Sequence, residues 1–486
     1  MNNVKTKYRM MRVRIKVWLI SLGLLPAFAL AQNPAAQSEN LKNLTKHEFS
    51  VQQAVDYALK NNATAKNALI DIKLQEETNK QITANAYPRL NGSLGTTYNA
   101  SIATQVIPNF ISPATYGVLI AEGVKDGNGN PIQMPGDFGS IAAQFGTKYS
   151  ANAGVSLNQL LFDGQVFVGL QARDASMNLV RRSADVTFEN IKANIHKVYY
   201  QLVVSKNQVE ILDANIALAE KNNKDTKVIY ENGFTDKLDV DNTTVTLANL
   251  KTEKQKLLNM ISNGYYALKL LMGMPIADEL VLTDKVTEDQ IKDGVLEAAA
   301  YKYEDRKDFQ QAQASKSLLE YNVRRYKLSQ IPTVSLSALY AKNAQREKWN
   351  FLNKGDWFTI SNIDLSITVP IFNGFYTKSK IQEAKLQVQK VSNLVETMKL
   401  VIDNDVEAAK NNYRSAVATM NSQKQNVELA EKNYQQTKKK YESGLSSQLA
   451  IEFAQTSLKT AQTNYITAMY DAVIAKVDFL KATGKL

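Results

Sequence analysis

The chain has 486 residues, a formal net charge of +11, two histidines and no cysteine. The missing cysteine excludes disulfides, thiolate catalysis and zinc–thiolate sites. Six of the positive charges lie within the first 16 residues, and removing them leaves +5 for the rest of the chain. Such a mild charge, without a basic cluster, does not predict a nucleic-acid-binding protein.

The amino terminus is typical of a secretory signal peptide. A basic segment precedes an apolar stretch from Val17 to Leu30, and Ala29-Leu30-Ala31 has the small-x-small pattern of a cleavage site. We therefore expect residues 1–31 to be a signal peptide that is removed on export. A membrane anchor is the alternative interpretation, although the apolar run is short for a spanning helix.

Residues 32–273 contain helix and strand patterns in a fixed order. Ser50-Val51-Gln52-Gln53 has the pattern of a capping box and begins a predicted helix over 50–86, which ends before Pro88. The predicted elements that follow are strands 89–103 and 148–162, a long helix 165–232 and a return helix 235–272.

The second part of the chain repeats this order after an irregular charged linker, residues 274–307. The predicted elements of residues 308–486 are a helix 308–330, strands 333–342 and 357–372, a long helix 375–443 and a return helix 446–482. In the first repeat Gly164, Gly233 and Gly273 are 69 and 40 residues apart, and in the second Gly374, Gly444 and Gly484 are 70 and 40 residues apart. Such repeats bury their apolar faces by stacking on one another.

The four predicted strands alternate apolar with polar residues, so each has one apolar face. Aromatic residues mark the strand ends, as in the lipid-facing band of a membrane β-barrel. Four strands are too few to close a barrel, so the chain is expected to assemble with copies of itself. Two copies would supply eight strands and three would supply twelve. Two insertions, 104–147 and 342–356, extend the strand hairpins on the side away from the helices.

Both long helices carry apolar residues at steps of three and four, which predicts coiled-coil packing. Each ends at a glycine, Gly233 or Gly444, in the position that favours a left-handed turn. The link to the return helix is short, so we expect an antiparallel hairpin at each glycine, with Thr235 or Ser446 capping the return helix. Since helices continue directly from strands, the pattern predicts a membrane barrel that leads into a helical tube.

These features resemble the TolC-like outer membrane efflux channel family, the outer membrane factors of tripartite efflux or type I secretion systems. The resemblance covers nearly the whole mature chain, 50–484. It rests on the opening capping box, Tyr87-Pro88, Ile331-Pro332, the two Phe-Asp/Asn-Gly turns and the two glycine tips. It implies a mainly α fold with a membrane β-barrel, in which a homotrimer forms a 12-stranded β-barrel continuous with a 12-helix α-barrel. It places the strands in the outer membrane and the helical barrel in the periplasm.

The resemblance also implies partners. The family's tip hairpins contact a periplasmic adaptor (membrane fusion) protein, which works with an inner-membrane pump of RND or ABC type. The adaptor contacts would then be Gly233, Phe234, Thr235, Gly444, Leu445 and Ser446.

Family members often narrow the tip with acidic residues shortly after the tip glycine. Asp239 falls at a matching position in the first repeat, with Asp241 near it. In the second repeat Ala450 and Phe453 occupy the comparable positions, and Glu452 is the acid close by. The candidates therefore allow an acidic gate or an apolar constriction at Phe453.

The predicted function is an outer-membrane exit channel that passively conducts drugs or other small molecules. A channel for type I protein secretion is the alternative, and a soluble periplasmic coiled-coil adaptor is a third reading, which the four strands disfavour. Nothing in the sequence predicts an enzyme, a cofactor or a metal site. Asp403 and Asp405 lie two residues apart on a helix and do not share a face, and His196 is expected to pack beside a helical seam.

Overall fold

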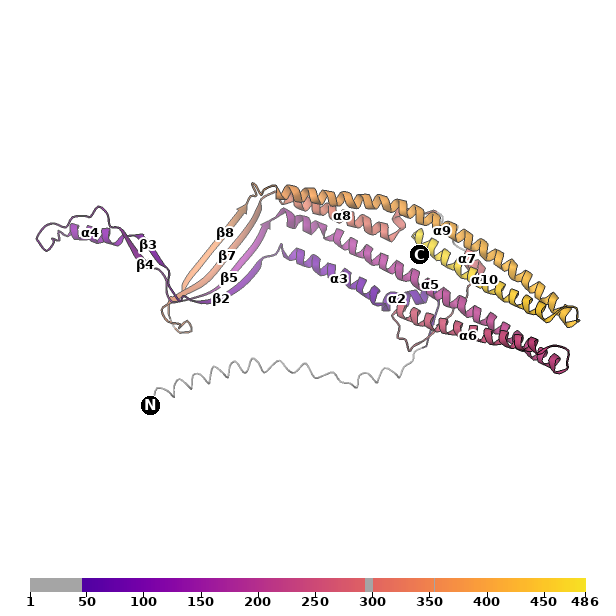
Figure 1. Ribbon diagram of the computed structural model, residues 1–486. Helices are drawn as coiled ribbons and strands as arrows, with labels where there is room; N and C mark the ends of the chain where they lie inside the picture. Colours follow the sequence, from indigo (N-terminus) through magenta and orange to yellow (C-terminus); the bar gives the residue numbers. More distant parts are fainter. Residues whose placement is uncertain (1–45, 293–299, 354) are drawn as a thin grey trace, which may run out of the picture.

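The computed structural model describes residues 46–292, 300–353 and 355–486. The molecule is elongated, with a small sheet between a helical bundle and a projecting arm (Figure 1). The predicted signal peptide, residues 1–31, lies outside the described residues.

The central sheet has four antiparallel strands in the order β2-β5-β7-β8. Their bounds are β2 Arg89–Tyr98, β5 Tyr149–Phe162, β7 Thr333–Arg346 and β8 Phe358–Thr368. The hairpin of the first repeat is therefore joined to the hairpin of the second through β5 and β7. The two outer strands, β2 and β8, are the edges of the sheet.

The strand register separates an apolar face from a polar face. One row across the sheet joins Leu90, Leu157, Ala338 and Ile363, and the neighbouring row on the other face includes Asn158, Ser337 and Asp364. Leu90 is 70% exposed and Ile363 is 77% exposed. The alternation predicted from the sequence thus produces a sheet whose apolar face is left uncovered by the residues that the structure describes.

Two long helices form the length of the molecule. They are α5 Gly164–Glu231 and α9 Tyr376–Glu442, with 68 and 67 residues, and each is about 100 Å long. Shorter helices stack in pairs beside them (Figure 1). The shorter helices are α2 Val51–Asn61, α3 Ala63–Ala84, α6 Lys237–Met272, α8 Lys307–Leu328 and α10 Gln448–Ala482.

The central helix α5 packs against α2, α3 and α6 of its own repeat and against α8 and α10 of the second. Helix α9 packs against α8 and α10. The buried side chains form several separate apolar clusters along this bundle, as in a coiled-coil assembly. None of the helices in the described ranges has the length and apolar character that crossing a bilayer requires.

The predicted single helix 50–86 is divided in two at Asn62. The Asn62 side chain accepts hydrogen bonds from the N–H groups of Thr64 (2.7 Å) and Ala65 (3.2 Å), and it donates to the carbonyl of Leu271 (2.7 Å). Asn62 therefore caps α3 and fastens the break to the end of α6. The tight contact needs Gly273, because a Cβ there would lie 2.6 Å from the Asn61 carbonyl oxygen.

The expected irregular linker, 274–307, contains short elements. Strand β6, Glu279–Leu282, pairs in parallel with β1, Lys46–Phe49, and α7 Glu288–Lys292 and a 3₁₀ turn at Tyr303–Asp305 follow. The Tyr199 hydroxyl donates to the Phe49 carbonyl (2.8 Å) and accepts from the Asp284 N–H (3.1 Å). The hydroxyl of Tyr199, which belongs to α5, thus holds the two-stranded sheet of β1 and β6 against that helix.

The insertion 104–147 is also ordered into elements. Strands β3 Thr104–Pro108 and β4 Ser140–Gln144 form an antiparallel ribbon, with helix α4 Ile111–Ala121 between them. These elements form the projecting arm, at the end of the sheet away from the helices (Figure 1).

Candidate functional site

The two predicted tips are helical hairpins of the same construction. Gly233 and Gly444 adopt positive φ angles of 78° and 72°. The N–H of Phe234 bonds to the Ile229 carbonyl (3.0 Å), and the N–H of Leu445 bonds to the Lys440 carbonyl (2.7 Å). These bonds, together with those donated by the two glycines, form Schellman motifs that end α5 and α9. Both hairpins lie at the end of the bundle remote from the sheet (Figure 1).

The tip residues present apolar side chains to solvent. Phe234 is 84% exposed and Leu445 is 78% exposed. Thr235 and Ser446 are half-buried beside them. Each tip thus exposes one large apolar side chain directly after its glycine.

The predicted caps of the return helices are wrong by one residue. Helix α6 has Asp236 at its N-cap position, and α10 has Ser447, whose hydroxyl accepts from the Ala450 N–H (3.3 Å). The Schellman motif extends through Phe234 or Leu445, so the chain needs one more residue before it re-enters a helix. Thr235 instead donates a hydrogen bond to the Asp239 carboxylate.

The acidic gate candidates differ in their exposure and in their partners. Asp239 is half-buried and held by Thr235, whereas Asp241 is exposed. Glu452 is half-buried and accepts a hydrogen bond from the Gln448 side chain (2.8 Å). Burial raises the pKa of Tyr441, and the carboxylates of Asp239, Asp225 and Glu452 raise it further. Asp239 of the first hairpin and Glu452 of the second thus both lie near Tyr441.

Phe453 differs from these acids because its side chain is largely free. Phe453 and Leu449 are each 75% exposed and lie one turn apart on α10. They border a groove of about 420 Å³ between α10 and the α5–α6 hairpin, whose other walls include Asn215, Asn222 and Thr243. The return helix of the second tip therefore carries an exposed apolar pair, and Ala450 stands at the position equivalent to Asp239.

The molecule has two outer edges, each formed by an edge strand and the helix next to it in the chain. Strand β2 follows α3 at one edge, and β8 leads into α9 at the other (Figure 1). Both edges carry exposed large apolar side chains: Leu69, Ile70 and Leu74 on α3, and Leu386, Leu394 and Leu400 on α9. Edge strands with unpaired backbone groups next to apolar helix surfaces favour assembly.

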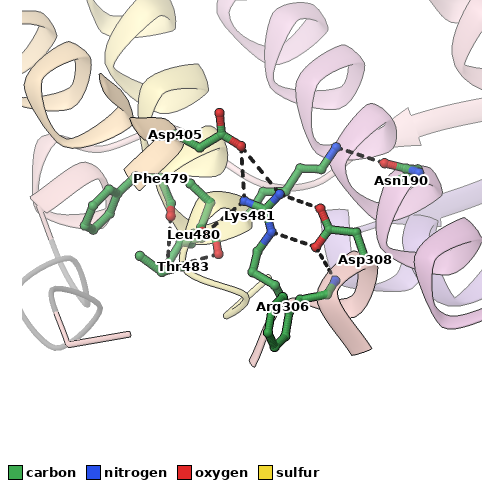
Figure 2. A network of polar contacts seen from close by, with 10 residues as sticks. Asn190, Arg306, Asp308, Asp405, Phe479, Leu480, Lys481 and Thr483 are labelled. Carbon is green, nitrogen blue, oxygen red and sulfur yellow. Dashed lines mark hydrogen bonds and ion pairs between the residues drawn. The ribbon is translucent and has the colours of Figure 1, made fainter. Parts of the chain in front are cut away.

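A buried polar junction ties the middle of the second repeat together (Figure 2). The Arg306 guanidinium, whose side chain is 11% exposed, contacts Asp308 (2.6 Å) and Asp405 (3.4 Å) and donates to the Ala482 carbonyl (3.2 Å). Burial alone would raise the pKa of Asp308, but the Arg306 guanidinium outweighs it and holds the pKa below its ordinary value. The junction joins the start of α8, the middle of α9 and the end of α10.

Asp403 and Asp405 have separate structural partners. The Tyr301 hydroxyl donates to Asp403 (2.6 Å), as does the Tyr303 hydroxyl (3.1 Å), while Asp405 faces Arg306. The bond to Asp403 and burial raise the pKa of Tyr301 to about 12. Sequence reasoning did not find these partners, which lie about 100 residues away along the chain.

The histidines lie in ordinary surroundings. Burial lowers the pKa of His196, and the nearby Lys192 acts in the same direction. The His47 ring lies 3.6 Å from the Asp278 carboxylate. Across 46–292, 300–353 and 355–486, no group of three or more potential ligand side chains is placed to hold a metal ion.

Comparison with known proteins identifies relatives. Residues 303–485 match the model of the outer membrane efflux protein family. The outer membrane protein TolC of Vibrio cholerae is 20% identical over 279 residues, which cover 57% of this chain. The aligned part spans 63% of TolC, less than two thirds of its length.

Solved structures share the fold across most of the chain. The outer membrane protein VceC of Vibrio cholerae has a TM-score of 0.66 at 16% identity, covering 89% of this chain and 96% of VceC. The CmeC outer membrane channel of Campylobacter jejuni has a TM-score of 0.68 at 16% identity, covering 90% and 85%. The MtrE outer membrane channel of Neisseria gonorrhoeae has a TM-score of 0.66 at 15% identity, covering 89% and 88%. The resemblance stated from the sequence is thereby confirmed: residues 303–485 match the outer membrane efflux protein family, and most of the chain shares the fold of such channels.

Proposed function

We propose that this protein is the outer-membrane exit channel of a tripartite efflux pump, and that it conducts drugs or other small molecules passively. Three copies would close into a 12-stranded β-barrel that continues as a 12-helix α-barrel in the periplasm. A periplasmic adaptor and an inner-membrane pump of RND or ABC type would supply cargo and energy.

The observation that carries this proposal is the coincidence of the sheet edges with the edges of the helical layer. An open sheet with an apolar face cannot remain in lipid, because each unpaired backbone group costs several kcal/mol. Pairing β8 of one copy with β2 of the next satisfies both edges. The rotation that relates one copy to the next would also place α9 of one copy beside α3 of the next. One repeated contact would then close both the sheet and the helical bundle.

The contact between the repeats supplies the pattern for this pairing. Within the chain β5 pairs with β7, and α5 packs against α8. The equivalents of β5 and α5 in the second repeat are β8 and α9, and the equivalents of β7 and α8 in the first are β2 and α3. Repetition of one contact through both repeats of each copy produces a closed ring.

A ring of three suits conduction better than a ring of two. An eight-stranded barrel has an interior that side chains fill, whereas a wider barrel leaves room for water. With the apolar face toward lipid, the polar face that includes Asn158, Ser337 and Asp364 would line the lumen.

At the periplasmic end, the exposed Phe234 and Leu445 would lead the contact with the adaptor, together with Gly233, Thr235, Gly444 and Ser446. We assign the narrowest point of the tip to Phe453 rather than to an acidic ring. This choice rests on the free side chain of Phe453 and on the bond that holds Asp239 to Thr235.

The test is purification of the processed protein from outer membranes in mild detergent, followed by native mass spectrometry and single-channel recording. A three-copy particle that conducts small ions, and a deletion strain that accumulates more drug, would support the proposal. A monomer that is released from cells without detergent would contradict it. A deletion strain with normal drug tolerance that fails to secrete a protein would assign the type I secretion alternative.

A further inference from the structure

The arm formed by residues 99–147 has a defined internal structure. The Asn109 side chain donates to the Ser112 hydroxyl (2.7 Å) and to the Phe138 carbonyl (3.2 Å), and its N–H donates to the Gly139 carbonyl (3.0 Å). The rings of Tyr116 and Phe138 meet edge to face at 5.5 Å. These contacts fasten α4 to the strand that returns along the arm, so the arm has a fixed surface to present.

That surface is apolar, and the described part of the chain does not cover it. Residues 99–121 contain no charged side chain, and no residue of α4 is buried. One face of α4 exposes Ile111, Ala114, Val118 and Ala121. Their steps of three, four and three are the spacing of a seam between paired helices. Val118 is 63% exposed, so the seam is open.

Lipid is a poor partner for this arm. The ribbon β3–β4 pairs only with itself among the described strands, and its outer backbone groups would be costly to leave unpaired in hydrocarbon. The charged residues of the arm are Glu122, Asp126 and Asp137 against Lys125. This negative balance also disfavours the anionic headgroups of a membrane surface. The cover should therefore be protein.

In the proposed trimer, the arms of the neighbouring copies lie at the same end of the barrel. Each arm leaves the sheet where Tyr98 and Tyr149 pair at a ring distance of 5.0 Å, next to the edge strand β2. Twelve strands about 4.8 Å apart and tilted by about 40° enclose a barrel of about 12 Å radius. Strand β3 and helix α4 together span about 30 Å. Each arm is thus long enough to pass the three-fold axis and meet the other two.

We propose that the three arms pack on one another through the exposed face of α4 and form a seal over the outer mouth of the channel. The inference rests on the proposed trimer, because the partner of each arm is another copy of the same chain. Tethering to one barrel rim raises the effective concentration of the arms, so even a short apolar seam suffices for association.

Cross-linking tests the contact directly. The natural chain contains no cysteine, so Val118→Cys introduces a single thiol at the centre of the α4 face. Oxidation of intact cells should convert most of this variant into a covalent pair of chains on a non-reducing gel. Asn128→Cys, in the exposed charged turn at the tip of the arm, is the matched control and should stay largely single. Native electrophoresis of the same membranes reports the trimer independently.

The outcomes separate the arm from the channel. A native trimer in which Val118→Cys stays unlinked overturns the arm contact and leaves the proposed function intact. A chain that never forms trimers overturns both proposals. Cross-linking of Asn128→Cys as strongly as Val118→Cys would also overturn the contact, because it would indicate random collision.

Conductance tests the seal. The double variant Ile111→Ser, Val118→Ser weakens the apolar face without altering the fastening at Asn109. In planar bilayers it should show larger and less interrupted currents than the natural protein at equal trimer yield. Currents equal to those of the natural protein would overturn the seal. In a second variant, a short Gly-Ser turn replaces residues 104–144. It should show the same increase in current, and it controls for local misfolding of α4 in the double variant.

Discussion

The seam between the two repeats and the outer edges of the chain are built from equivalent elements. In the seam, β5 pairs with β7 and α5 packs against α8. At the edges, β8 and α9 stand on one side of the molecule and β2 and α3 on the other, with their apolar side chains exposed. The seam within one chain is therefore the pattern for the contact that we propose between neighbouring copies.

The strand-to-helix joints of the two repeats show the same contrast at the level of single residues. At the inner joint, the Asp163 side chain caps α5 by accepting from the Gln165 N–H (2.7 Å), and Gly164 packs tightly against the end of α8. At the outer joint, Gly374 and Phe375 both have positive φ angles and α9 begins later, at Tyr376. One glycine is required for close packing and the other for its backbone conformation.

The largest effect is expected from a charge on the apolar face of the edge strand. Leu365 is 62% exposed, and Leu365→Arg should cost about 2–4 kcal/mol for each copy near the middle of the bilayer. Trimer yield in the outer membrane should fall to a small fraction of normal. Ser366→Arg, one residue further along on the polar face, is the control and should assemble. Normal yield of Leu365→Arg would refute the assignment of the lipid-facing surface.

The two joint glycines should respond differently to alanine. A Cβ at position 164 would lie 2.7 Å from the Leu328 carbonyl oxygen, so Gly164→Ala should destabilise the protein by about 2–3 kcal/mol through overpacking. Gly374→Ala meets open space but keeps a φ of 62°, which should cost about 1 kcal/mol. Thermal unfolding of the purified proteins measures both losses of stability. Equal losses would refute the difference between the inner and the outer joint.

The polar junction at Arg306 should matter for stability and for its pH dependence. Arg306→Met leaves the partly buried Asp308 and Asp405 without their cation, which should cost about 2 kcal/mol at neutral pH. Since the folded-state pKa of Asp308 is lowered, its contribution is present above the pKa of the unfolded chain and is lost as pH falls through the lowered value. The difference between the natural and variant proteins should therefore shrink in acid. A difference that stays constant between neutral and acidic pH would contradict this.

The smallest effects are expected at the two tips. Asp239→Ala should raise conductance slightly or alter block by divalent cations, since Asp239 is engaged by Thr235. Phe453→Asp, in the exposed apolar pair on the return helix of the second tip, should introduce a clear cation block. Planar-bilayer recordings measure both changes. An unchanged trace for Asp239→Ala removes Asp239 from the gate, and an unchanged trace for Phe453→Asp removes Phe453.

The features that the sequence predicted well depend on local physics. The tips at Gly233 and Gly444 follow from the positive φ that a Schellman motif requires, and the strands follow from strict alternation of apolar and polar residues. The resemblance to the efflux channel family rested on the order of such signals.

Other features escaped prediction because their causes are distant along the chain or have no periodicity. The break at Asn62 depends on the end of α6, which lies more than 200 residues away. Strands β1 and β6 have four residues each, too short for a pattern. In the arm, frequent Pro and Gly residues indicated a loop, so the helix α4 was not predicted. The partners of Arg306 are brought together only by the packing of α8, α9 and α10.

The proposed contact between copies can be tested directly by cross-linking. Val155 and Leu365 occupy equivalent positions in the two repeats, because each lies 9 residues before the glycine at its strand-to-helix joint, Gly164 or Gly374. In the same way, Pro88 and Pro332 give the alignment of β2 with β7. Transferring the in-chain pair Leu157↔Ala338 to the outer edges places Ile367 of one copy opposite Leu94 of the next. The double variant Leu94→Cys, Ile367→Cys should therefore form disulfides between copies on oxidation. The expected result is a covalent ladder that ends at three chains; a ladder that ends at two chains, or a single band of monomer, would contradict the proposed trimer.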